Sequence, residues 1–141
     1  MSAFINIEDY DARIHREILD ALVREDEAII EIIEDQSIAL MRSYLNNRYD
    51  CNTIFSATGS DRNNLILKMS LDITVYEIFC VHNPQKISQT TKDRYDRAMT
   101  WLKEVNAGKV SIDGAPLQPE DVLAANLPWL TISNKKRVNH Y

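Results

Sequence analysis

The run "NNLILKMSLDITVYEIFCV", residues 63–81, constrains the fold more than any other part of this chain. It is apolar on nearly every side of a helix, and a helix of this kind is normally surrounded by other helices. Three charged residues inside it, Lys68, Asp72 and Glu77, make it too polar for a comfortable membrane span. We therefore predict a central buried helix from about 62 to 81.

The ends of this helix are predicted from the flanking residues. The preceding segment "ATGSDRNN" is rich in turn formers, so we interpret residues 46–61 as a polar linker, and Ser60 or Asp61 can cap the helix. Pro84 keeps Asn83 out of the α region and ends the helix there.

Amphipathic segments flank the central helix on both sides. Residues 6–24 are expected to form one or two short helices that start at Asn6, and a longer helix is expected at 26–48. The acidic positions of the longer helix, Glu27, Glu31, Glu34 and Asp35, are interpreted as a solvated face.

A further helix is expected after "ISQTT", with Thr90 as its N-cap and Gly108 as the glycine that closes it. The chain has only three glycines and four prolines, which disfavours a turn-rich β fold. The predicted fold class is all-α: a compact bundle of four to five helices over 1–112, followed by an extended C-terminal arm over 113–141. The arm has room for one short helix near 119–127.

Asp72 needs a partner if it is buried in the middle of an apolar helix. Arg48, at the end of the 26–48 helix, is the candidate, and we predict an Arg48–Asp72 pair that fixes how the two helices dock. A role for Asp72 as a general acid or base finds no companion nucleophile or histidine at a readable spacing.

The sequence carries no recognisable catalytic or cofactor motif. The histidines, at 15, 82 and 140, share no zinc-site spacing, and Cys51 and Cys80 do not form a C-x-x-C pair. Cys80 and His82 are two residues apart and so point to different sides of a helix. We expect no catalytic residue, metal or cofactor and no enzymatic activity. A small enzyme that uses Asp72 or the glutamate-rich face is the remaining alternative.

The charge of the chain is unevenly distributed. Residues 1–36 carry eleven acids and three bases (−8), residues 37–130 carry ten of each, and residues 131–141 carry three bases (+3). The net charge of −5 disfavours sequence-independent nucleic-acid binding. A helical DNA-binding or packaging accessory protein, with Lys135, Lys136 and Arg137 on phosphates, is kept as a second alternative.

Trp129 and Leu130 lie in a segment with no fold of its own, and apolar side chains there gain most from docking on a surface. Together with Lys135, Lys136 and Arg137, they are the predicted partner contacts. The partner is another copy of the chain or a different protein.

Three stretches, in order, resemble a known family. They are "SYLNNRYD", "LDITVYEIF" and "RYDRAMTWLKEVNAGKVSI", within residues 15–112. Their order and spacing are similar to those of the small helical head–tail connector proteins of tailed phages and Mu-like prophages. The closest likeness is in the last core helix and its closing turn: Arg94-Tyr95, Ala98, Trp101-Leu102 and Gly108-Lys109.

The resemblance implies a structural virion protein, made in the host bacterial cytoplasm and incorporated into the virion. Such connectors form a homo-oligomeric ring, commonly of twelve subunits, below the portal protein. They bind a tail or stopper protein on the other side, and DNA passes through the ring without specific binding. The family offers no catalytic residues and no membrane association to carry over. The arm past Asp113 departs from the family pattern.

Overall fold

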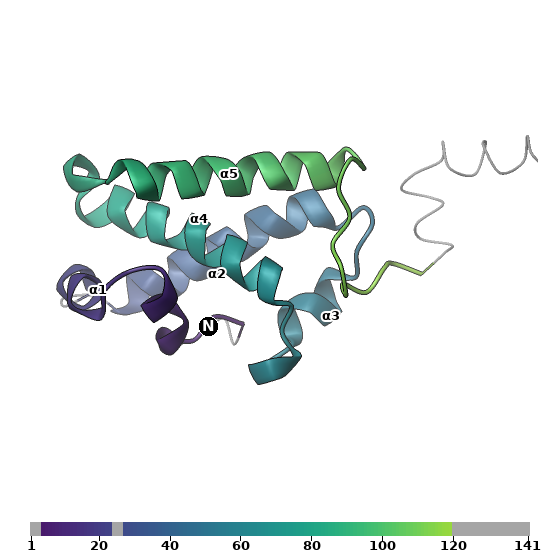
Figure 1. The fold of residues 1–141 in the computed structure, drawn as a ribbon. Helices are drawn as coiled ribbons and strands as arrows, with labels where there is room; N and C mark the ends of the chain where they lie inside the picture. Colours follow the sequence, from purple (N-terminus) through teal and green to yellow (C-terminus); the bar gives the residue numbers. More distant parts are fainter. Residues whose placement is uncertain (1–3, 24–26, 120–141) are drawn as a thin grey trace, which may run out of the picture.

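The computed structural model describes residues 4–23 and 27–119, and these form an all-helical body (Figure 1). In chain order the elements are η1 Ile7–Ala12, α1 Arg16–Val23, α2 Glu27–Leu45, α3 Cys51–Ser56, η2 Gly59–Asp61, α4 Asn64–His82, η3 Pro84–Lys86 and α5 Gln89–Asn106. The prediction of an all-α fold is confirmed. Within the described ranges, no helix is both long and apolar enough to cross a membrane.

Helices α2, α4 and α5 form the centre of the molecule, and each packs against the other two (Figure 1). The middle of α4 is buried without interruption from Met69 to Val75, as its apolar sequence predicts. Tyr76 on α4 and Tyr95 on α5 stack with ring centroids 4.0 Å apart. The N-terminal segment, η1 and α1, covers the part of α4 that the other two long helices leave open.

Two helix starts differ from the sequence prediction. Helix α4 is capped by Asn63, whose side chain accepts hydrogen bonds from the N–H groups of Leu65 and Ile66, rather than by Ser60 or Asp61. Those two residues lie in η2, one short turn earlier. Helix α5 is capped by Ser88, which accepts from the Thr91 N–H, so Thr90 lies inside the helix.

The predicted polar linker at 46–61 is wrong in part, because it contains helix α3 and the turn η2. Asp50 caps α3 by accepting from the Thr53 N–H, and Cys51 and Ile54 are buried in the core. Helix α2 correspondingly ends at Leu45 instead of Arg48. Gly108 has a φ of 81° and closes α5, as predicted.

The first residues of the predicted arm pack on the body. Leu117 forms an isolated antiparallel bridge with Tyr49, and the Asp50 N–H donates to the Pro116 carbonyl at 2.9 Å. The Gln118 N–H donates to the Arg48 carbonyl at 2.9 Å. The chain therefore still contacts the α2–α3 connection at Gln118, and the predicted short helix near 119–127 lies beyond the described residues.

Candidate interaction site

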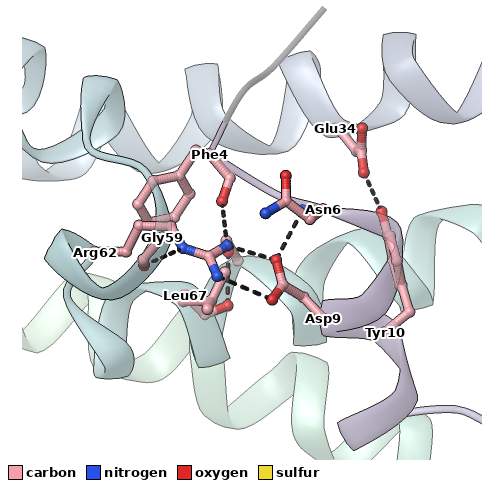
Figure 2. A network of polar contacts seen from close by, with 9 residues as sticks. Phe4, Asn6, Asp9, Tyr10, Glu34, Gly59, Arg62 and Leu67 are labelled. Carbon is pink, nitrogen blue, oxygen red and sulfur yellow. Dashed lines mark hydrogen bonds and ion pairs between the residues drawn. The ribbon is translucent and has the colours of Figure 1, made fainter.

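The N-terminal segment is fastened to the helical body by a set of polar contacts. Arg62, just before α4, is the centre of the first (Figure 2). Its Nη1 and Nη2 atoms contact Asp9 Oδ2 and Oδ1 at 2.5 and 3.1 Å. Nη1 also donates to the Phe4 carbonyl at 2.7 Å, and Nε donates to the Gly59 carbonyl at 2.9 Å. One guanidinium thus joins η1 to the turn before α4.

Asp9 is also tied to its own segment, because the Asn6 N–H donates to Asp9 Oδ2 at 2.7 Å. Partial burial alone would raise the pKa of Asp9. The hydrogen bonds from Arg62 and Asn6 and the charge of Arg62 outweigh it, and the pKa lies below its ordinary value. The Asp9 carboxylate therefore stays ionised while it is bound to Arg62.

Tyr10 and Glu34 make the second contact, deeper in the molecule (Figure 2). Tyr10 is fully buried, and its Oη donates to Glu34 Oε2 at 2.5 Å. Burial raises the pKa of Glu34 to about 6, although the Tyr10 hydrogen bond acts in the opposite direction. The interpretation of Glu34 as part of a solvated face is wrong, because η1 covers this side of α2.

The third contact concerns Asp72, which pairs with Arg13 rather than with the predicted Arg48. Arg13 Nε lies 3.2 Å from Asp72 Oδ1, an ion pair without hydrogen-bond alignment. Arg94 on α5 donates from Nη1 to the Arg13 carbonyl at 3.1 Å. Burial raises the pKa of Asp72, and the charges of Arg13 and Arg94 oppose this rise.

Arg48 lies in the turn after α2, where it makes other contacts. Its guanidinium lies over the Tyr49 ring, 5.5 Å from the centroid, and its backbone carbonyl holds Gln118. The partner of Asp72 instead comes from a segment 59 positions earlier in the chain, a pairing that helix spacing does not reveal.

The fastened segment forms one wall of a groove of about 1340 Å³. This volume exceeds the roughly 300–1,000 Å³ of typical small-molecule pockets. The other walls come from the start of α2, the end of α4, and the segment around η3 and the start of α5. Its apolar lining comprises Ala12, Ile14, Ile18, Ala21, Ile29, Val75 and Phe79. Its polar lining comprises Asp11, Arg13, His15, Glu17, His82, Asn83, Lys86, Ser88, Thr90, Thr91 and Arg94.

The groove has the character of a docking surface. Ile18 is 44% exposed although it is a large apolar residue. The lining brings His15 and His82 to one surface, a proximity that the sequence did not indicate, whereas Cys80 does not line it. In the ranges 4–23 and 27–119, no three His, Cys, Asp or Glu side chains are grouped as metal ligands.

The predicted partner contacts Trp129, Leu130, Lys135, Lys136 and Arg137 lie outside the described residues. Arg62, Arg13 and Glu34 were missed as interacting residues. The partners of Arg62 and Glu34 are Asp9 and Tyr10, which are adjacent in the sequence of the predicted N-terminal helix. Nothing in that local sequence indicates which distant residues they contact.

A family model described as "Bacteriophage Mu, Gp36" matches residues 4–127, which is most of the chain and includes the whole helical body. No curated protein and no solved structure matches. The matched range ends before Trp129, so the apolar and basic end of the arm lies beyond it.

Proposed function

This chain belongs to the bacteriophage Mu Gp36 family, and from that membership we propose that it is a structural head–tail connector of a phage or prophage particle. In this role the chain assembles into a homo-oligomeric ring of about twelve subunits below the portal protein. The ring joins the head to a tail or stopper protein, and DNA passes through it without being bound specifically. The protein is made in the bacterial cytoplasm and ends in the virion.

The observation that carries the proposal is the family match over residues 4–127 of an all-helical body. The helical body supplies a compact unit that can repeat around an axis, and the arm after Pro119 supplies a segment that can reach a neighbour. Head-to-tail contacts of this kind close into rings when the rotation between subunits permits it.

The build of the molecule also supports a structural role. The two buried carboxylates among the described residues, Glu34 and Asp72, contact residues that hold the N-terminal segment in place. These residues organise packing, and the groove beside them is lined by both apolar and polar side chains.

The decisive experiment is assembly on a portal. The full-length chain would be mixed with the portal protein of the same phage or prophage, and the mixture examined by negative-stain and cryo-electron microscopy. We expect an added ring on one end of the portal, with a subunit number that matches the portal. A chain that neither binds the portal nor enters particles made in its presence would overturn the proposal.

A further inference from the structure

The C-terminal part of this chain contains apolar residues that suit the groove between α1, α4 and the start of α5. We propose that Trp129–Ile132 of a neighbouring copy docks in this groove, so that each copy receives the arm of the next. The inference deepens the proposed connector function, on which it rests, by naming the contact that links adjacent subunits.

The apolar lining matches the apolar part of the arm. Ile14 and Ile18 face the groove from the N-terminal segment, and Val75 and Phe79 face it from α4. The arm carries three large apolar residues, Trp129, Leu130 and Ile132, within four positions. Large apolar groups gain free energy when contact removes them from water.

The N-terminal segment brings acidic residues to the groove. Residues 1–36 have a net charge of −8, and Asp11 and Glu17 line the groove wall. On the same surface, Arg13 faces Asp72 and Arg94 donates to the Arg13 carbonyl, so both are directed inward. The bases at 135–137 follow the apolar run in the sequence, so Asp11 and Glu17 are their acidic counterparts in the groove, where Lys86 is the remaining base.

The length of the arm points to a neighbour. Gln118 is docked at the end of α2, where its Nε2 donates to the Asn46 carbonyl at 3.1 Å, whereas Ile29 lines the groove near the start of α2. At 1.5 Å per residue, Leu45 and Ile29 are about 24 Å apart along the helix.

Residues 120–128 must cover that distance if the arm is to reach the groove of its own copy. As the short helix that the sequence predicts near 119–127, they span only about 14 Å. Fully extended, the eleven steps from Gln118 to Trp129 span about 36–40 Å, of which the path along α2 alone takes about 24 Å. The groove of an adjacent copy removes this constraint, because adjacent copies can place one groove beside the other's arm.

Disulfide trapping between two chain populations tests the proposal. Tagged full-length chains carry Ile18→Cys, untagged full-length chains carry Thr131→Cys, and both carry Cys80→Ser. Cys51 is buried, and burial raises the pKa of its thiol, so it stays unreactive. Under mild oxidation we expect a disulfide-linked dimer of one tagged and one untagged chain.

The matched control is Ile32→Cys in the tagged chain, because Ile32 is 54% exposed on α2 and does not line the groove. We expect it to give no more than background dimer. Adding Trp129→Ala to the untagged chain should lower the yield about tenfold, the factor that corresponds to about 1.4 kcal/mol of lost burial.

Two results would overturn the docking proposal. One is an equal yield with Ile18→Cys and Ile32→Cys. The other is a disulfide that forms only within single chains carrying both Ile18→Cys and Thr131→Cys, which would place the arm in its own groove. Electron microscopy of the same chains with the portal separates the two hypotheses. Rings without the Ile18–Thr131 cross-link contradict only the docking, and the cross-link without rings contradicts only the connector function.

Discussion

At the scale of single residues, the body is held together by ionisable groups that the sequence presents as ordinary surface charges. Asp9, Glu34 and Asp72 each receive a partner from a distant part of the chain: Arg62, Tyr10 and Arg13. Their pKa values differ in direction because their balance of burial and hydrogen bonding differs. That of Asp9 is lowered, and those of Glu34 and Asp72 are raised.

Glu34 predicts a pH dependence of stability. Burial raises its pKa from an ordinary value of 4.5 to about 6, so the folded chain binds more protons than the unfolded chain between these pH values. The free energy of unfolding should therefore fall by about 2 kcal/mol as the pH rises from about 4.5 to about 6.

Glu34→Gln should remove this fall, because the amide keeps an acceptor for Tyr10 without a titrating proton. Urea unfolding between pH 4 and pH 8 measures it. The raised pKa of Asp72 contributes a slope of the same sign that remains in the variant. An unchanged difference between low and neutral pH in Glu34→Gln would show that Glu34 titrates normally.

Arg62→Ala should cost about 2–4 kcal/mol of unfolding free energy, since it leaves Asp9 and the Phe4 carbonyl without their charged donor. Arg42→Ala is the control: Arg42 also bonds a side chain, Asn52, but at an exposed site, and its loss should cost less than about 1 kcal/mol. Urea unfolding at pH 7 and amide exchange over residues 4–14 measure the two effects. Equal losses of unfolding free energy in the two variants would mean that the contacts of Arg62 stabilise the fold no more than an exposed surface contact does.

At the scale of elements, two segments are held by contacts with α4: the N-terminal segment before α2 and the segment around Asp113 that follows α5. Arg13 docks the first on the middle of α4, and Asn63 joins the second to its start, since Asn63 Nδ2 donates to the Asp113 carbonyl at 2.9 Å.

A double-mutant cycle distinguishes the two candidate partners of Asp72. The pair Arg13→Ala and Asp72→Asn should show a coupling energy of about 1–3 kcal/mol in urea unfolding, as contacting charged residues do. The pair Arg48→Ala and Asp72→Asn should be additive within about 0.5 kcal/mol. Coupling through Arg48 alone would restore the pairing predicted from the sequence.

Asn63→Ala should cost about 1–2 kcal/mol, because it removes the cap of α4 and the hydrogen bond to the Asp113 carbonyl. Ser60→Ala and Asp61→Ala, the caps expected from the sequence, should each cost less than about 0.5 kcal/mol. Thermal unfolding of the three variants ranks them. A larger effect at position 60 or 61 would contradict the observed start of α4.

At the scale of the whole molecule, the described residues form a helical body whose groove and last described residues lie at opposite ends of α2. The groove is lined by Ile29 near the start of α2, and Gln118 is docked beside Asn46 at its end. In a head-to-tail assembly, the surface that binds the next copy differs from the surface that the previous copy binds. The groove and the end of α2 are two such separate places.

Deleting residues 129–141 should impair ring assembly on the portal and leave the helicity of the chain unchanged. The expected reason is that the apolar end of the arm contacts another copy or the portal. Far-ultraviolet circular dichroism measures helicity, and electron microscopy with the portal measures assembly. Complete rings from the shortened chain would show that the arm is not needed.

The sequence by itself determined the helical class, the central position of α4 and the glycine stop after α5. These follow from local patterns: apolar residues on all sides of 63–81, helical periodicity on either side, and the left-handed conformation that glycine adopts readily. The helix boundaries were less certain, because several capping residues stand next to one another before α4.

Only the tertiary structure decided which charges meet. The contacts of Asp72 with Arg13 and of Glu34 with Tyr10 join positions 59 and 24 residues apart. Many bases and hydroxyl groups in the chain could serve each carboxylate equally well, so local spacing does not select one. The selection comes from how the N-terminal segment packs across α2 and α4, and the same packing builds the groove.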